Sequence, residues 1–127
     1  MNTKSFILML AQARPKSFVS GVPVDLSDKL RSSNRTEFHH LMPRSFLKSS
    51  GQAGAESILA NFAFLSRADN RELGGVAPSA YKAKMAGNID EILAAALCPA
   101  SLFGDVYADF CQERAKLLAD EANRLCA

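Results

Sequence analysis

The longest regular pattern in this chain is an apolar stripe near its C-terminus, and it constrains the fold more than any other feature. Apolar side chains recur there at steps of three and four residues, at Phe103, Val106, Tyr107, Phe110, Leu117, Leu118, Ala122 and Leu125. This spacing predicts one long amphipathic helix over residues 102–125. So long a stripe must be covered, and we expect the rest of the domain, together with a partner domain or a second copy in a homodimer, to cover it.

The other predicted elements are short. Alternation and aromatic content favour strands at Thr36–Leu41 and Asn61–Ser66. Helices are predicted over residues 3–13, through Leu30, over 45–48 and 56–60, from a cap at Asp69-Asn70 to Gly74-Gly75, and over 78–85 and 89–97. The fold class is therefore α+β and mostly helical. Because an isolated two-stranded hairpin is weak, we expect the N- and C-terminal helices to pack over it.

A length of 127 residues is that of a single domain. We divide it into an N-terminal helix and connector (1–30), a central part (31–85) and a helical extension (86–127). The net charge of +2 is too small to indicate nucleic acid by itself, but its distribution is uneven. The central part has eight basic and four acidic residues, whereas the extension has three basic and seven acidic residues. This asymmetry suits a polyanion at the central part, although a charge bias of this size is more often simply a solvated surface.

Three widely spaced cysteines, Cys98, Cys111 and Cys126, are interpreted as reduced, buried thiols of an intracellular, cytoplasmic protein. The apolar segment 5–11 is at the short limit for a signal peptide, and we expect it to be a buried helix instead. No segment approaches the roughly 20 apolar residues of a membrane span, so no membrane association is expected.

The central part holds the residues that carry chemistry. Its two adjacent histidines, His39 and His40, end the first predicted strand, Asn61 begins the second, and Asn70 lies at the start of the following helix. Each residue alone favours a structural role: a satisfied histidine pair, a turn asparagine and a helix cap. Their combined order and spacing favour a site that binds a metal and activates water.

The segment Glu37-Phe-His-His-Leu-Met-Pro-Arg-Ser-Phe-Leu-Lys48 closely resembles the first element of HNH, or ββα-metal, nucleases. The segments from Asn61 to Arg71 and from Gly75 to Met85 resemble the elements that follow it. The whole is most similar to the C-terminal HNH domain of GmrSD-type modification-dependent restriction endonucleases. The resemblance covers residues 14–85 and implies a small ββα-metal core within the domain.

This resemblance implies a role for each residue. His40 stands at the general-base position, and Asn61 stands at the central asparagine that ties down the loop after the first strand. His39 and Asn70 stand at the metal-ligand positions. The implied reaction is hydrolysis of DNA phosphodiester bonds, which leaves 5′-phosphate and 3′-hydroxyl ends, in a bacterial restriction or phage-defence system. The implied partner is an N-terminal NTP-linked domain or a separate subunit.

One imidazole and one amide oxygen favour Mg²⁺ or Mn²⁺, with Zn²⁺ or Ni²⁺ as alternatives. Because neighbours on a regular strand face opposite sides, the two histidines can serve one site only if the strand curls near Pro43. The basic residues expected to contact phosphate are Arg44, Lys48, Arg67 and Arg71, with Arg71 preferred because it follows Asn70.

Two other functions remain open at this point. The first is a non-catalytic DNA-binding or regulatory remnant of such a protein, which would bind DNA in a salt-sensitive way without cutting it. The second is a helical interaction module with structural histidines, which would bind neither metal nor DNA.

Overall fold

The computed structural model describes residues 3–24, 38–52 and 58–126. Within them, the elements in chain order are α1 (Thr3–Gln12), β1 (Phe38–His40), α3 (Arg44–Ser49), η1 (Leu59–Asn61), β2 (Phe62–Phe64), α4 (Arg67–Leu73), α5 (Pro78–Tyr81), η2 (Lys82–Lys84), α6 (Ile89–Ala95), η3 (Ala100–Gly104) and α7 (Tyr107–Cys126), where η marks a 3₁₀ helix. The fold is α+β and mostly helical, as predicted. The helix predicted through Leu30 lies outside the described residues.

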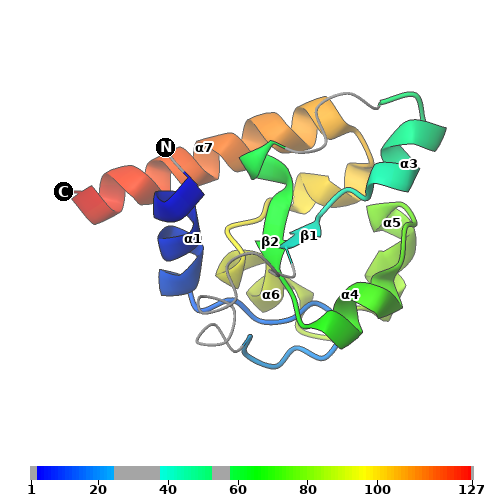
Figure 1. Ribbon diagram of the computed structural model, residues 1–127, viewed down its shortest axis with the longest axis horizontal. Coiled ribbons are helices and arrows are strands. Elements are labelled where there is room, and N and C mark those ends of the chain that lie inside the picture. The colour runs from blue at the N-terminus through cyan, green and yellow to red at the C-terminus, as the bar shows by residue number, and fades with distance from the viewer. Residues whose placement is uncertain (1–2, 25–37, 53–57, 127) are drawn as a thin grey trace.

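The two strands form a small antiparallel sheet at the centre of the molecule (Figure 1). His39 lies opposite Ala63, and His40 lies opposite Phe62. Both strands are shorter than predicted, and residues 36 and 37 of the first prediction fall outside the described part. The connection between the strands contains α3 and η1, so the sheet is not closed by a tight turn. It therefore depends on the packing of other elements.

Helices pack around this sheet in two apolar clusters. The larger one joins the loop after β1, the strand β2 and the helices that follow them, and its fully buried members include Leu41, Leu65, Leu73, Tyr81, Ile92 and Phe110. The smaller one lies where α1 packs across the C-terminal half of α7 (Figure 1), and its buried members are Phe6, Met9, Leu10, Phe64 and Leu118. Phe64 of β2 thus contacts both terminal helices, which agrees with the expectation that they cover the sheet.

The C-terminal helix begins at Tyr107, five residues later than predicted. Residues 100–104 form the separate helix η3, and Asp105 then adopts a left-handed conformation with φ of 61°, which interrupts the helical path. The predicted stripe also needs correction at two positions, because Val106 and Leu117 are 47% and 38% exposed.

A charged residue completes the buried face of α7. Arg114 lies four residues after Phe110 and four before Leu118, and all three are buried. Positions four apart share one face of a helix. Arg114 therefore occupies a place that the apolar pattern would assign to a leucine or phenylalanine.

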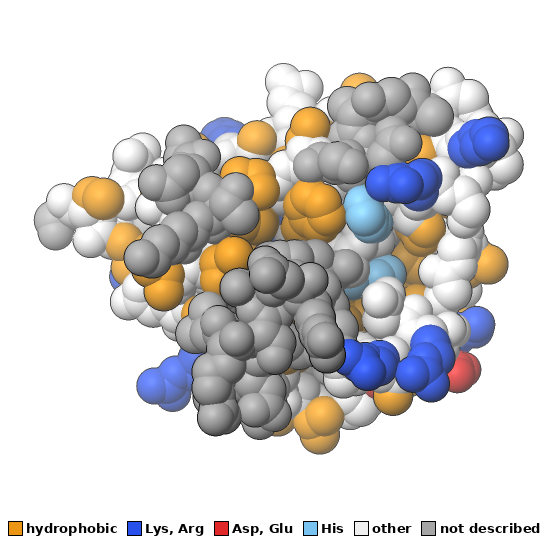
Figure 2. Space-filling view, in the orientation of Figure 1, with side chains coloured by type: hydrophobic (Ala, Val, Ile, Leu, Met, Phe, Trp, Pro, Cys, Tyr) orange, Lys and Arg blue, Asp and Glu red, His pale blue; other side chains and the backbone are white. Residues whose placement is uncertain are grey.

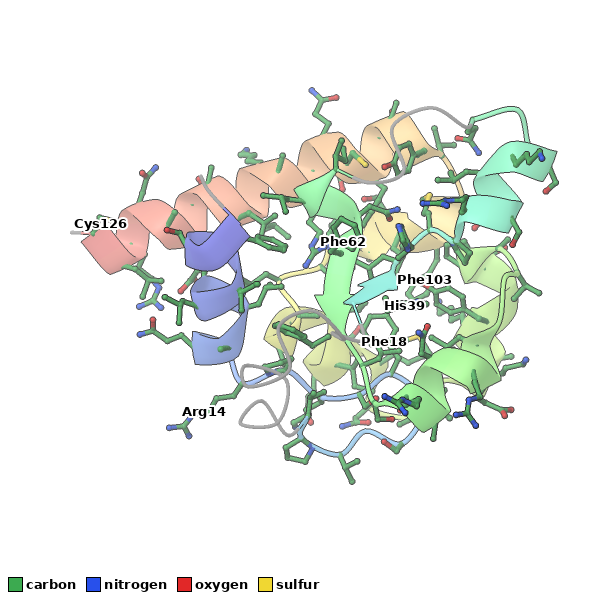
Figure 3. The ribbon with its side chains drawn as sticks, in the orientation of Figure 1. Arg14, Phe18, His39, Phe62, Phe103 and Cys126 are labelled. Atoms are coloured by element: carbon green, nitrogen blue, oxygen red, sulfur yellow. The ribbon has the colours of Figure 1, made fainter. Side chains whose placement is uncertain are left out.

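The cysteines differ in exposure. All three are free thiols, but only Cys98 is fully buried, Cys111 is half-buried, and Cys126 near the end of α7 is exposed. The prediction of buried thiols is therefore wrong for Cys126, which lies where α7 extends beyond its neighbours (Figure 3). Of the helices that the structure describes, none combines the length and apolar character needed to cross a membrane.

Candidate metal and general-base site

β1 ends in the two histidines, and both line one small, open pocket. The pocket has a volume of about 170 Å³, and its lining residues are His39, His40, Pro43, Arg44, Asn70 and Gly74. Figure 2 shows the histidine side chains together on one face of the molecule. Both reach one pocket because β1 ends at His40 and the chain turns into α3 immediately after Pro43.

His39 is the inner histidine and is 3% exposed. Its ring lies among the rings of Phe18 and Tyr81, at centroid distances of 6.4 and 6.2 Å (Figure 3). Burial lowers the pKa of His39 to about 4; a hydrogen bond with Asn70 opposes this shift, and the nearby charge of His40 adds to it. His39 is therefore neutral near pH 7, which is the form in which imidazole binds metals.

Asn70 of α4 contacts His39 directly. The distance from His39 Nδ1 to Asn70 Oδ1 is 2.6 Å. The other ring nitrogen of His39, Nε2, is buried and has no hydrogen-bond partner among the described residues. The structure thus brings together the two predicted metal ligands, which come from segments 31 residues apart.

The residues present fit a divalent cation. A neutral imidazole nitrogen and an amide oxygen are ordinary ligands, and an ion held by this pair would replace the proton of their hydrogen bond. The described part of the chain contains no cluster of three or more His, Cys, Asp or Glu side chains suited to a metal. An ion held by His39 and Asn70 would leave positions open for water and phosphate oxygens.

Asp69 fixes the helix that carries Asn70. Its Oδ2 accepts hydrogen bonds from the backbone N–H groups of Val19 and Ser20, both at 2.9 Å, and from Ser20 Oγ at 3.1 Å. Burial alone would raise the pKa of Asp69, but the hydrogen bonds from Ser17, Ser20 and Val19 hold it below its usual value. α4 is therefore anchored to the segment after α1.

The predicted cap of this helix is wrong. Ser66 is the N-cap of α4, since its side chain accepts a hydrogen bond from Asp69 N at 3.1 Å. Asp69 and Asn70 are thus inside the helix, where one serves as an anchor and the other faces His39. The predicted end is right, because Gly74 follows the helix with φ of 65°.

The loop after β1 is fixed by Asn61 and Tyr81. Asn61 Oδ1 accepts from Met42 N at 2.8 Å, and Asn61 Nδ2 donates to Met42 O at 3.1 Å. The backbone of Leu41 is held as well: its N–H donates to Asn61 O at 2.8 Å, and its carbonyl accepts from the Tyr81 hydroxyl at 2.6 Å. Every backbone polar group of Leu41 and Met42 is therefore bonded directly after His40.

His40 is half-buried at the end of the strand. Its ring packs on that of Phe62, its cross-strand partner, at a centroid distance of 4.8 Å. Cross-strand side-chain pairs of this kind stabilise an antiparallel sheet. The packing on Phe62 and the fixed loop after it together orient His40 at the pocket.

Basic side chains surround the histidines on two sides (Figure 2). Arg44 and Lys48 belong to α3, Arg67 and Arg71 belong to α4, and all four are exposed. Of these four, only Arg44 lines the pocket. The expected phosphate contact of Arg71, which follows Asn70 in the sequence, stays a prediction.

Three residues that shape this site were not assigned these roles from the sequence. Asp69 anchors α4 to Val19, Tyr81 donates to the carbonyl of Leu41 in the loop after β1, and Arg114 donates to the carbonyl of Phe62 in β2. One sequence feature indicates that Arg114 is buried: it lies four residues after Phe110 and four before Leu118, on the apolar face of the predicted helix. The hydrogen bonds of Asp69 join residues 49 and 50 positions apart, and that of Tyr81 joins residues 40 positions apart. The local sequence pattern therefore does not reveal them.

Comparisons of the chain with protein-family models, with curated proteins and with solved structures found no match in any of the three.

Proposed function

We propose that the chain is a metal-dependent DNA endonuclease in which β1, β2 and α4 form the ββα-metal element of HNH nucleases. The observation that carries the proposal is the contact of His39 Nδ1 with Asn70 Oδ1, at 2.6 Å, on the wall of a pocket that His40 also lines. The resemblance of the sequence assigns these same residues to a metal and a general base.

In this proposal His40 accepts a proton from the water that attacks the scissile phosphorus. The bond from phosphorus to O3′ breaks, and the products carry a 5′-phosphate and a 3′-hydroxyl group. Asn61 acts indirectly, because its two bonds to Met42 fix the loop that follows His40. Proton transfer to His40 requires that its ring be correctly oriented, and the packing of this ring on Phe62 supports that orientation.

His39 and Asn70 would hold the divalent ion, for which Mg²⁺ and Mn²⁺ suit the mixed nitrogen and oxygen set best. The bound ion would supply Lewis-acid stabilisation of the negative charge that develops on the phosphate. Neutral His39 supports this role, since a pKa of about 4 leaves its ring unprotonated over the physiological range.

DNA is the proposed substrate because exposed basic side chains flank the pocket. Arg44 lies at the pocket itself, while Lys48 on α3 and Arg67 and Arg71 on α4 are exposed basic residues. Guanidinium groups bind phosphate oxygens with suitable geometry. Contacts of this kind position a duplex without reading its sequence.

A bacterial restriction or phage-defence system is the proposed setting, with an NTP-linked domain or subunit as partner. A site of this kind cuts one strand at a time. A double-strand break would therefore need two chains or two successive nicks, and a homodimer would supply the second site.

The test is nicking of a supercoiled plasmid with Mg²⁺, Mn²⁺, Ni²⁺, Zn²⁺ or EDTA. His40→Ala and Asn70→Ala are compared with the wild type, and Asn88→Ala is the matched control because Asn88 is exposed at the start of α6, outside the pocket lining. We expect metal-dependent nicking that His40→Ala and Asn70→Ala abolish and that Asn88→Ala retains.

The other outcomes separate the alternatives. Salt-sensitive DNA binding with no cleavage under any metal would favour a non-catalytic DNA-binding role. The absence of both metal and DNA binding would favour an interaction module in which His39 and Asn70 form a structural pair. Cleavage that persists in His40→Ala would contradict the assignment of the general base.

A further inference from the structure

Arg114 is the largest fully buried side chain of the described residues, and it binds only backbone carbonyl groups there. Its guanidinium donates to Leu97 O at 3.2 Å, to Ala60 O at 3.0 Å, to Phe62 O at 2.5 Å and to Ala96 O at 3.1 Å. No carboxylate lies within ion-pair distance of it in the described part of the chain. A buried cation without a counter-ion is unusual and costly, so its contacts require an explanation.

Two of these carbonyls flank Asn61. Arg114 Nη1 bonds Ala60 and Phe62, the residues immediately before and after Asn61. The carbonyl of Asn61 itself points the other way and accepts from Leu41 N at 2.8 Å. Ala60 and Asn61 end η1 and Phe62 begins β2, and at this junction the carbonyls of Ala60 and Phe62 bond Arg114 while that of Asn61 bonds Leu41.

Arg114 therefore supplies hydrogen-bond donors to the backbone at the junction of η1 and β2. An unpaired strand edge leaves carbonyl groups without partners, and burial makes this costly. Because Nη1 bonds the carbonyls of the residues before and after Asn61, it restrains the backbone on both sides of the Asn61 side chain, which in turn bonds Met42. The contacts thus form a path from α7 through Asn61 to the loop after His40.

We propose that Arg114 is a positioning residue for the general base: it fixes Asn61, and through Asn61 and Met42 it fixes His40. This inference rests on the proposed nuclease function for its catalytic consequence. Lysine is a poor substitute, because a single ammonium group cannot bond carbonyls on both sides of Arg114 with the planar geometry of a guanidinium.

The test compares Arg114→Lys and Arg114→Met with Leu118→Ala. Leu118 is buried one turn further along α7 and packs in the smaller cluster with α1, so its truncation destabilises the same helix while both hydrogen bonds of Arg114, to Ala60 O and Phe62 O, keep their donor and acceptors. Hydrolysis of bis(para-nitrophenyl) phosphate with Mn²⁺ is measured at a temperature at which circular dichroism shows every variant to be folded. If Arg114→Met does not fold, Arg114→Lys keeps the charge and part of the bonding.

We expect kcat to fall about 10- to 100-fold in the Arg114 variants, because small displacements of a reacting group have effects of this size. KM and Mn²⁺ affinity should stay near the wild-type values, since His39 and Asn70 are held by other contacts. Leu118→Ala should keep its kcat. Equal kcat in Arg114→Lys and Leu118→Ala would overturn the proposal.

A second readout does not depend on catalysis. Hydrogen exchange of the Met42 amide, relative to that of the Ile92 amide in α6, should be about tenfold faster in Arg114→Lys than in the wild type. In Leu118→Ala the ratio should not change. If the wild type hydrolyses no phosphodiester, the nuclease proposal fails. The exchange ratio still decides whether Arg114 fixes the loop after His40. An unchanged ratio in Arg114→Lys would refute this role of Arg114.

Discussion

The side chain of Asn61 forms two hydrogen bonds with the backbone of Met42, one with its N–H at 2.8 Å and one with its carbonyl at 3.1 Å. Asn61 is fully buried, and so are these contacts. A primary amide is the one short side chain that offers an acceptor and a donor side by side for such a pair. This relationship closes the loop after β1 onto η1.

Replacement of Asn61 by alanine should leave both Met42 groups without partners. Each unsatisfied buried group costs about 1–3 kcal/mol, so we expect Asn61→Ala to lower the free energy of unfolding by about 2–4 kcal/mol. Urea unfolding followed by circular dichroism measures this change. Asn88→Ala, at an exposed N-cap whose side chain donates to Glu91 Oε2 at 3.2 Å but does not cap the backbone, should cost about 0.5–1 kcal/mol. A loss in Asn61→Ala as small as that of the control would show that water replaces the amide.

Tyr81 should stabilise the same loop through one bond. Its hydroxyl donates to Leu41 O at 2.6 Å in a fully buried site, and burial raises the pKa of Tyr81 well above its usual value, so the donor stays protonated. We expect Tyr81→Phe to cost about 1–2 kcal/mol, since it removes the donor and leaves the ring in place. Combination with Asn61→Ala tests the coupling, because two residues that hold one loop should show non-additive losses.

Cys98 should make stability depend on alkaline pH. Burial raises the pKa of its thiol from 9.0 to about 12, and the charge of Arg114 opposes the shift. Above pH 9 the thiol of the unfolded chain loses its proton while that of the folded chain keeps it. The contribution of Cys98 to stability is therefore complete below pH 9 and is lost as the pH rises toward about 12, by at most about 1.4 kcal/mol per pH unit.

Urea unfolding between neutral and alkaline pH measures this effect. Lysine and tyrosine side chains also titrate in this range, so the difference between variants is the useful quantity. Cys98→Ala should flatten the alkaline decline, whereas Cys126→Ala, at an exposed thiol, should leave it unchanged. Identical slopes for both variants would contradict the prediction.

The sequence predicts the parts of the fold that depend on local pattern. Arg14-Pro15 and Gly74 mark the ends of α1 and α4 correctly, because backbone restrictions act within one or two residues. Asp105 shows the limit: a left-handed conformation at a non-glycine residue splits one predicted helix into η3 and α7. Its side chain accepts from Ser79 N at 3.0 Å, a contact across 26 residues that helical periodicity does not contain.

The candidate site likewise has a part that the sequence predicts and a part that it does not. The sequence predicts His39, His40, Asn61 and Asn70 as site residues because their order and spacing carry the resemblance, and the structure brings the histidines and Asn70 to one pocket. Arg114 was assigned to no role because its guanidinium bonds four backbone carbonyls, which have no signature in the side-chain sequence. Contacts of a side chain with distant backbone become visible only in the folded chain.

Metal binding should stabilise the protein through His39 and Asn70 but not through His40. An ion that binds only the folded chain raises the free energy of unfolding by about 2.7 kcal/mol at a concentration of 100 times its Kd. We therefore expect Mn²⁺ to raise the melting temperature of the wild type and of His40→Ala, and EDTA to reverse the increase. Because His39 Nδ1 and Asn70 Oδ1 adjoin each other at 2.6 Å, loss of either should remove the increase.

Asn70→Ala is the more informative of these two variants, since Asn70 is half-buried whereas His39 lies in the core, where its replacement also leaves a cavity. Asn88→Ala is again the matched control and should keep the full Mn²⁺ effect. An equal rise in melting temperature for the wild type and Asn70→Ala would place the ion elsewhere. The contact between His39 and Asn70 would then be a structural hydrogen bond that holds α4 against β1.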